Sequence, residues 1–218
     1  FHLGRNLGSV DAAGKAVPGA QFPVAKRVLA AGHLLANHSF SHGVMAKLAD
    51  DAVRVEAAST ETLLDAAGRT PSALFRFPYG ARNSEGMAAL ADAHLKSVMW
   101  NIDSLDWADP VPSSITNRVL ASVDKAGRGI VLFHDIHERT VKALPAVLDK
   151  LIAEGYQFAG WDGTSFQVAK STAPAPEKVP VTTGYANSWA VVIGIDDYAK
   201  WPKLQYAVRD AQGIRETL

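Results

Sequence analysis

Short apolar runs alternate with amphipathic helical stretches from Phe1 to about Lys170 of this 218-residue chain, with a repeat of about 30 residues. This alternation is typical of parallel strands whose connecting helices cover the sheet, so the pattern predicts an α/β fold. In parallel barrels the functional residues collect at the C-terminal ends of the strands. We therefore expect a site to be built from the residues that follow the expected strands.

The expected elements follow from periodicity and from Gly, Pro and Ser boundaries. Helices are expected over residues 24–31, 50–67, 84–93, 115–126 and 140–154. Strands are expected over residues 34–36, 74–76, 97–102, 130–133 and 156–159. Gly68 and Gly127 are the expected helix stops, and Ser84 and either Ser113 or Ser114 are the expected N-caps. The last helix has an expected apolar stripe, formed by Leu144, Leu148 and Leu151.

Composition limits the class of protein. The chain has 48% hydrophobic residues, enough for a packed core, and its 22 basic residues balance 22 acidic ones, which argues against a nucleic-acid-binding surface. No apolar run approaches the roughly 20 residues of a membrane-spanning helix. The absence of cysteine excludes a disulfide scaffold, thiolate metal ligands and a cysteine nucleophile within these residues.

Three segments are expected along the chain. Residues 1–170 form the main α/β domain, and residues 171–183, which carry three prolines among small polar residues, form a semi-extended linker. Residues 184–218 begin a second, partial α/β domain with a strand at 189–195 and a helix at 207–218. Because the chain starts at Phe1 and stops inside an expected helix, we expect a fragment whose signal peptide, if any, lies upstream.

His38 and His42 follow the apolar run 34–36 at a spacing of four residues. If the backbone turned helically here, both imidazoles would lie on one face and could bind one divalent metal ion. A catalytic site of this kind needs a third protein ligand, commonly a carboxylate. The alternative is a loop that carries two polar residues, and the motifs downstream favour the metal site.

Arg76 ends the next expected strand and precedes the turn Pro78-Tyr79-Gly80. An arginine at a strand end can hold a carboxylate with two hydrogen bonds and lower its pKa. The alternative is a surface arginine that lies over Phe75. The backbone N–H of Tyr79 could donate to a developing oxyanion, with Pro78 fixing the turn.

Asp103, Asp106 and Trp107 lie after the strand 97–102, and His134 lies after the strand 130–133. A carboxylate beside a catalytic histidine stabilises the imidazolium and fixes its tautomer. His134 could instead be a buried core residue, but its strand-end position favours a general acid. Leu132 alternates with its neighbour Phe133, so one of the two points toward the interior near His134.

At these residues the chain resembles the NodB-type polysaccharide deacetylases, a family of carbohydrate esterases. Their signatures H-[ST]-x-x-H, R-x-P-[FY], D-x-x-D-W and L-x-H are similar to residues 38–42, 76–79, 103–107 and 132–134. The resemblance covers residues 1–170 and implies a distorted (β/α) barrel, here incomplete. It also implies a hydrolase that removes N-acetyl groups from glycans such as chitin oligomers or peptidoglycan, breaking carbon–nitrogen bonds that are not peptide bonds.

The resemblance implies that His38 and His42 are metal ligands, usually for zinc and sometimes for cobalt or another divalent ion. Arg76 would orient the catalytic base, and the backbone N–H of Tyr79 would stabilise the oxyanion. The reaction would be metal-assisted hydrolysis, in which a carboxylate base takes a proton from the attacking water.

The same resemblance implies roles for the later motifs. Asp106 would tune His134, which would act as the general acid that protonates the departing amine. Trp107 and Leu132 would line the pocket for the acetyl group.

One family motif is missing from the chain. In the family, T-F-D-D-G supplies the base and the third metal ligand as adjacent aspartates, and Phe1-His2-Leu3-Gly4 resembles the strand that follows this motif. We expect the intact protein to carry the aspartates upstream. We therefore predict that the 218-residue chain alone binds metal weakly and has no deacetylase activity.

The end of the chain resembles the start of a caspase-like peptidase domain. Residues 189–198 are similar to its first strand and residues 204–211 to the entry of its first helix. The catalytic histidine and cysteine of such a domain would come later, so no catalytic residue is transferred. The alternative is the βα unit of another α/β domain.

The leading interpretation is a glycan deacetylase domain of a secreted, periplasmic or envelope-facing bacterial protein, fused to a caspase-like domain. Its expected partner is an N-acetylated glycan. One alternative is a catalytically silent glycan-binding module. The other is a protein that acts by proteolysis, with the barrel targeting a cysteine-type endopeptidase. An upstream Asp-Asp pair would favour catalysis over binding, and a downstream His and Cys would favour a peptidase.

Overall fold

The computed structural model describes residues 1–168, and these alternate strand and helix as expected. The linker predicted at 171–183 and the second domain predicted at 184–218 lie outside the described residues. Within the described part, no helix combines the length and apolar character needed to cross a membrane.

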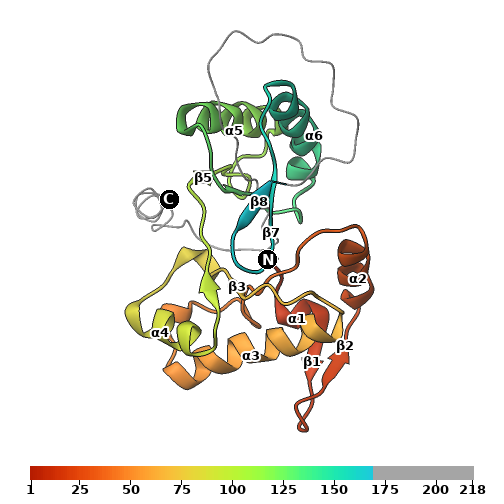
Figure 1. The fold of residues 1–218 in the computed structure, drawn as a ribbon, viewed down its shortest axis with the longest axis vertical. Coiled ribbons are helices and arrows are strands. Elements are labelled where there is room, and N and C mark those ends of the chain that lie inside the picture. The colour runs from red at the N-terminus through yellow and green to blue at the C-terminus, as the bar shows by residue number, and fades with distance from the viewer. Residues whose placement is uncertain (169–218) are drawn as a thin grey trace.

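Five longer helices account for most of the regular structure. They are α2 (Phe22–Ala30), α3 (Asp50–Ala66), α4 (Ser84–Asp92), α5 (Pro112–Ala126) and α6 (Glu138–Ala153). The short elements are α1 (Gly4–Leu7), β1 (Gly8–Val10), β2 (Ala16–Pro18), and the 3-10 turns η1 (Met45–Lys47) and η2 (Pro78–Gly80). Figure 1 shows α5 and α6 side by side in one half, whereas α3 runs along the base of the other half with α1 and α4 against it.

Parallel pairings connect stretches that are far apart in the sequence. His2 bridges Asn37, and Asn37 bridges Phe75 at the end of β3 (Leu74–Phe75). β3 pairs in parallel with β4 (Lys96–Ser97). The chain therefore places the start of the protein, the histidine motif and the Arg76 motif next to one another, as strand-end motifs of a parallel sheet would be.

A second parallel pair lies in the other half of the molecule. β5 (Ile102–Asp103) pairs with β6 (Val131–Leu132), and Asp103 stands opposite Leu132 in this register. The pairing brings together the loops that carry Asp106 and His134. Regular sheet in the described residues is limited to four two-stranded sheets, two parallel and two antiparallel, so the incomplete barrel implied by the resemblance stays a prediction.

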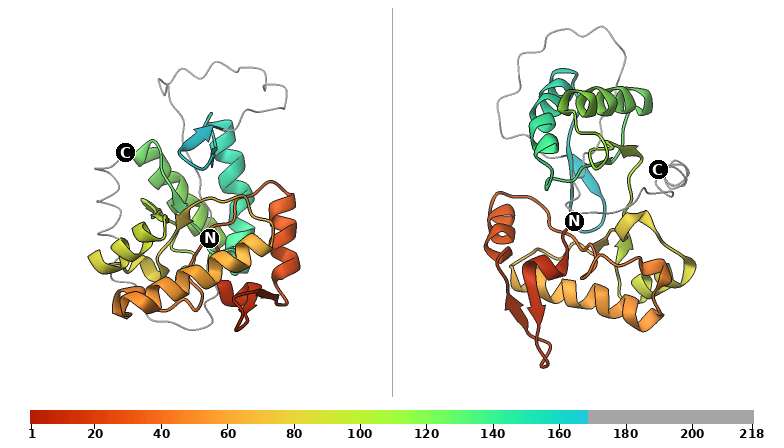
Figure 2. Two further views of the ribbon diagram at one scale, coloured as in Figure 1. Left: turned by 60° about the horizontal axis from the view of Figure 1, so that its bottom comes forward. Right: turned by 180° about the vertical axis from the view of Figure 1, so that it is seen from behind.

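The single strand predicted over residues 97–102 is wrong in one respect. The stretch 96–103 contains two short strands, because its first part pairs with β3 and its second part with β6. The N–H of Val98 donates to the carbonyl of Phe75, and the N–H of Ile102 donates to the carbonyl of Ile130. This stretch consequently links the two halves seen in Figure 2.

Helix stops were predicted more successfully than helix starts. Gly68 and Gly127 follow α3 and α5 with left-handed φ angles of 89° and 70°, as expected for residues that end a helix. The predicted N-caps are wrong. Asn83, not Ser84, caps α4 by accepting the N–H of Gly86, and α5 begins one residue before Ser113, with proline at its first position.

The apolar stripe predicted on the last helix is also partly wrong. The buried face of α6 is formed by Ala143, Val147 and Leu151 and packs on α5. Leu144 and Leu148 lie at the margin of this face and are only partly buried.

The described part of the chain ends in a hairpin. The predicted strand 156–159 lies too early, because β7 spans Ala159–Trp161 and pairs antiparallel with β8 (Phe166–Val168). The indole N–H of Trp161 donates to the carbonyl of Ser72 at 2.8 Å, which fastens the hairpin to the segment that leads into β3.

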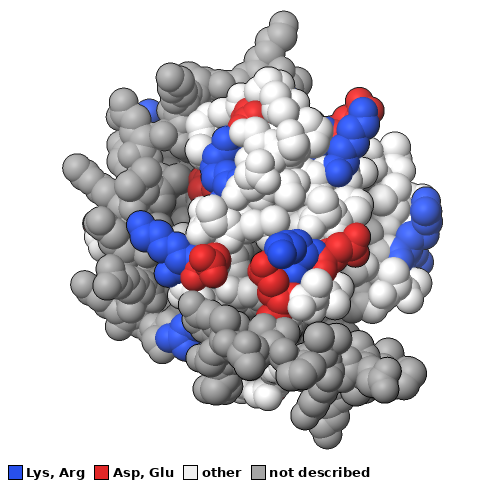
Figure 3. All heavy atoms as spheres, turned by 90° about the horizontal axis from the view of Figure 1, so that it is seen from above, with Lys and Arg blue, Asp and Glu red and all other residues white. Residues whose placement is uncertain are grey.

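Charged side chains are mixed on the surface that Figure 3 presents. Lys and Arg lie next to Asp and Glu there, and neither sign gathers into a large patch. This face therefore lacks the single-sign field that nucleic-acid binding requires.

Candidate active site

The two histidines of the first motif come together, but not on a helix. Their ring centroids lie 5.0 Å apart at an interplanar angle of 70°, and both side chains are buried, His38 at 2% and His42 at 6% exposure. The helical turn predicted here is wrong. Residues 37–42, which we call the histidine loop, are irregular, and Ser39 and His42 adopt left-handed φ angles of 67° and 64°.

A hydrogen bond sets the tautomer of His38. Its Nδ1 lies 2.7 Å from the backbone carbonyl of Arg76. Because a carbonyl can only accept, Nδ1 must carry the proton, and Nε2 then holds the lone pair that a metal ion needs. The pair of neighbouring imidazoles therefore fits a zinc-type ion. Among the described residues, however, no group of three His, Cys, Asp or Glu side chains is placed to hold one.

Arg76 is a core residue. It is 1% exposed, its Nε donates to the carbonyl of Val98 at 3.2 Å, and its guanidinium lies over the rings of Phe1 and Trp100 at 4.2 and 5.5 Å. The alternative of a surface arginine is therefore excluded. The prediction that Arg76 orients a catalytic carboxylate stays a prediction.

Tyr79 lies beside the histidine loop. Its ring makes an edge contact with the ring of His42, with centroids 4.5 Å apart. Its backbone is left-handed, with φ 61° and ψ 5° inside η2. This conformation is uncommon for a residue other than glycine and is found where a peptide group must be turned in a particular direction. The role of its N–H in binding an oxyanion stays a prediction.

Asp106 and His134 form a buried pair, which we call the acid–imidazole pair. Asp106 Oδ1 lies 2.7 Å from His134 Nδ1, and Asp106 Oδ2 accepts the backbone N–H of His134 at 2.6 Å. Asp106 Oδ2 also accepts the hydroxyl of Thr140 at 2.6 Å. Asp106 is fully buried, so the carboxylate is fixed on both oxygens and holds the proton of the imidazole on Nδ1.

The hydrogen bonds at Asp106 decide its charge. Burial raises the pKa of the Asp106 carboxyl, but the bonds from His134 and Thr140 outweigh burial and leave the pKa below its ordinary value. Asp103 lies nearby, and burial raises its pKa although it accepts the N–H of Leu105 at 2.8 Å. The carboxylate that touches the histidine is therefore the one held ionised.

Trp107 and Leu132 were predicted to line an acetyl pocket. Leu132 is buried in a cluster with Met99, Trp100 and Ile130, whereas its neighbour Phe133 packs with α5 and α6 on the opposite side. Trp107 is half-buried, and its carbonyl accepts a bond of 3.2 Å from Arg139. The prediction that these two side chains form a pocket stays a prediction.

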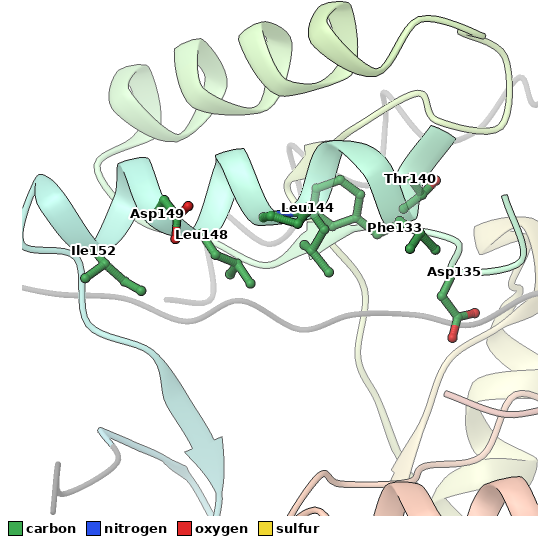
Figure 4. Close-up of a pocket in the computed structure, with 9 residues that line it drawn as sticks. Phe133, Asp135, Thr140, Leu144, Leu148, Asp149 and Ile152 are labelled. Carbon is green, nitrogen blue, oxygen red and sulfur yellow. The ribbon is translucent and has the colours of Figure 1, made fainter. Parts of the chain in front are cut away.

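An apolar groove of about 530 Å³ opens along α6. Figure 4 shows Leu144, Leu148 and Ile152 along the groove, with Thr140 and Asp135 at the end that leads to the acid–imidazole pair. Neither Trp107 nor Leu132 is among its lining residues. The groove is thus a separate surface from the predicted acetyl pocket.

Several residues that hold the motifs in place were not predicted from the sequence. Thr140 and Arg139, at the start of α6, bond the carboxylate and the carbonyl of Asp106. Glu56, in the middle of α3, bonds the histidine loop. The position of Thr140 in the first turn of α6, six residues after His134, is a signal that could have marked it as a partner of the acid–imidazole pair. Glu56 gives no local signal, since its partners lie in another segment.

Comparison with known proteins identifies a family with the same expected motifs. The polysaccharide deacetylase family model matches residues 9–98. The peptidoglycan-N-acetylglucosamine deacetylase PgdA of Listeria monocytogenes is 32% identical over 149 residues, which cover 66% of this chain and 31% of that protein. The chain thus spans about a third of the length of this relative.

Solved structures are similar over a larger share of their own length. The T48 deacetylase with substrate is 32% identical, with a TM-score of 0.61, and the match covers 78% of this chain and 79% of that one. A family 4 carbohydrate esterase pseudoenzyme from Bacillus anthracis, BA3943, is 28% identical with a TM-score of 0.57, covering 62% and 47%. The chain therefore belongs to the polysaccharide deacetylase family.

Proposed function

We propose that this protein is a metal-dependent hydrolase that removes N-acetyl groups from a glycan. The observation that carries the proposal is the acid–imidazole pair, in which a buried carboxylate is bonded to the Nδ1 of His134 at a strand end. The stretch 96–103 links this half of the molecule to the half that carries the histidine loop. PgdA, by its name, acts on N-acetylglucosamine of peptidoglycan. The proposed substrates are peptidoglycan, chitin oligomers or a similar glycan.

Several residues of this chain have separate proposed roles in the reaction. Because Asp106 fixes the proton of His134 on Nδ1, the Nε2 side of the ring is the side that can hold and deliver a proton to the departing nitrogen. Tyr79, whose ring contacts that of His42 and whose backbone is left-handed, is proposed to donate its backbone N–H to the oxyanion. Trp107 and Leu132 are proposed to contact the acetyl group.

A divalent metal ion, zinc by preference, is proposed to bind His38 and His42. When bound, such an ion lowers the pKa of water and polarises the substrate carbonyl. Two imidazoles alone leave the ligand set one short of the usual three. We therefore propose that an aspartate pair outside the sequence printed above completes the ligand set and supplies the base that Arg76 orients.

The protein is proposed to act outside the cytoplasm. A glycan of the cell wall or an extracellular chitin oligomer would place the protein outside the cytoplasm, in the periplasm or in the envelope. The resemblance of residues 189–211 to a caspase-like domain supports a fusion with a cysteine-type peptidase.

A silent glycan-binding module that targets the peptidase is the second candidate. Two observations favour it: no group of three metal ligands is present in the described range 1–168, and one similar structure is described as a pseudoenzyme. A silent module would bind N-acetylated glycans without releasing acetate.

The test uses the complete gene product and N-acetylglucosamine oligomers, with acetate release and bound metal measured together. His134→Ala should abolish turnover and leave the metal content intact, whereas His42→Ala should remove the metal and the activity. Loss of metal in His134→Ala would show that the role of general acid has been assigned to the wrong residue. Glycan binding without acetate release by the wild-type protein would replace the hydrolase with the silent module.

A further inference from the structure

Side chains bind the N–H groups in the middle of the histidine loop, whereas the carbonyls of Ser39 and Phe40 accept the backbone N–H groups of Gly4 and Arg5. Each backbone N–H from Ser39 to His42 donates to a side-chain oxygen. Ser39 donates to Asn37 Oδ1 at 2.9 Å, and His42 donates to Ser39 Oγ at 3.0 Å. The two N–H groups between them donate to the same carboxylate of α3.

That carboxylate belongs to Glu56. Its Oε2 accepts the N–H of Phe40 at 2.9 Å and the N–H of Ser41 at 2.8 Å, and its Oε1 accepts the hydroxyl of Ser41 at 2.7 Å. Hydrogen bonds to an ionised acceptor are roughly twice as strong as neutral ones. Glu56 thus makes the strongest set of contacts to the middle of the loop.

The loop needs such support because its conformation is costly. Ser39 and His42 both occupy the left-handed region, at φ 67° and 64°. A residue other than glycine is strained in this region, because its Cβ crowds the following carbonyl oxygen. The left-handed turn at His42 is also what brings its ring edge-on to that of His38. A loop without its side-chain acceptors would relax toward cheaper backbone angles and move the ring of His42.

A second carboxylate of the same helix supports the start of the loop. Asn37 Nδ2 donates to Glu61 Oε1 at 2.8 Å, and Glu61 is paired with the buried Arg69 at 2.5 Å. This contact orients Asn37, which lies before the first histidine. Glu56 instead contacts the residues between the two histidines, so it is the one of these two carboxylates that bears directly on their relative position.

We propose that Glu56 is a positioning residue that presets His42 opposite His38 before any metal ion arrives. Glu56 acts through the backbone of Phe40 and Ser41. The part of the inference that concerns metal affinity rests on the proposed function, whereas the part that concerns the ring geometry stands on the structure alone.

The first experiment titrates Zn²⁺ by calorimetry into the metal-free 218-residue chain. Glu56→Ala should weaken Zn²⁺ binding by about tenfold, the lower end of the effect of removing a group that orients metal ligands. Glu56→Gln should restore most of the affinity, because its oxygen can accept the two N–H groups and its amide can donate to Ser41 Oγ. Asp51→Ala, at an exposed position on the first turn of the same helix, should leave the affinity unchanged.

The second experiment needs no metal. Nuclear Overhauser contacts between the rings of His38 and His42 should be present in the metal-free wild-type chain and in Glu56→Gln, and lost in Glu56→Ala. Thermal unfolding of each variant, followed by circular dichroism, checks that the fold persists.

The two experiments separate the two proposals. A Glu56→Ala chain that is less stable but keeps the ring contacts would overturn the inference and reduce Glu56 to a structural residue. Unchanged Zn²⁺ affinity in that variant would do the same. The third outcome is that the wild-type chain shows the ring contacts, Glu56→Ala loses them, and the wild-type chain binds no Zn²⁺. This outcome would support the inference about Glu56 and contradict the metal site of the proposed function.

Discussion

The histidine loop and the acid–imidazole pair both bury imidazole rings, but they hold them by different means. In the loop, side chains from α3 bind the backbone, and the ring of His42 is aimed by the path of the chain. In the pair, the ring of His134 is bonded directly to the carboxylate of Asp106, and α6 contributes a hydroxyl to the same carboxylate.

This difference predicts which substitutions disturb the geometry of a cluster and which lower the stability of the fold. A site held through its backbone loses geometry when a distant anchor is removed. A site held through a buried charge loses stability when either partner is removed, because the remaining polar groups are left without a bonding partner.

The largest expected effect separates the two clusters directly. Asp106→Ala should lower the free energy of unfolding by about 3 kcal/mol, because it strips the acceptor from the buried donors of His134 and Thr140. His42→Ala should cost only about 1–2 kcal/mol, since it removes the ring contacts with His38 and Tyr79. Urea unfolding of both variants measures the contrast.

Equal losses in these two variants would break the comparison. Asp106→Asn provides a further control, because it keeps one acceptor oxygen and should fall between the wild type and Asp106→Ala in stability.

An intermediate effect is expected at the second anchor of the pair. Thr140→Val keeps the shape of the side chain but removes the hydroxyl that donates to Asp106 Oδ2, and it should cost about 1 kcal/mol of unfolding free energy. Thr140→Ser should recover most of this loss. Thr62→Val is a matched control, because Thr62 is exposed and bonds only a carbonyl of its own helix, so its change should be within about 0.5 kcal/mol.

A stability change in Thr140→Val no larger than that in Thr62→Val would mean that the hydroxyl contributes nothing to holding the carboxylate.

The smallest effect is a dependence on acidity. The pKa of Asp106 in the folded protein lies below its ordinary value of 3.8, so its ionised form stabilises the fold. This stabilisation is complete above the unfolded pKa and is lost as the pH falls through the folded pKa. The stability advantage of the wild type over Asp106→Asn should therefore shrink as the pH is lowered below 3.8.

Urea unfolding at several acid pH values measures this advantage. Asp109, whose pKa is lowered to about 2 by its bond with Arg118, loses its own contribution in the same range in both proteins and cancels in the difference. Burial raises the pKa of Asp103, which therefore acts with the opposite sign in both proteins. An advantage that grows on acidification would contradict the cause given for the pKa of Asp106.

Much of the fold was accessible from local signals. The stops at Gly68 and Gly127 were predictable, because a left-handed residue after a helix is a property of glycine itself. The helix starts were not, since Asn83 and Ser84 are both good caps and the choice depends on the path of the chain before them.

The candidate site was predictable as a set of residues but not as a geometry. The pairing of Asp106 with His134 was implied by the family resemblance, and the structure bonds the two at the ends of the parallel strands β5 and β6. The histidine loop was misjudged as a helical turn, since its anchor Glu56 lies 15 or 16 residues further along the chain. The buried face of α6 was also misjudged, because Ala143 and Val147, not Leu144 and Leu148, pack with Leu151 in the core.

The stretch from Lys96 to Asp103 is paired to a different partner at each end, and this has an evolutionary consequence. One residue gained or lost between β4 and β5 would shift one of the two registers and turn its side chains to the opposite face. Insertions and deletions should therefore be absent here among functional descendants, whereas the exposed tip of the β1–β2 hairpin is free to vary in length.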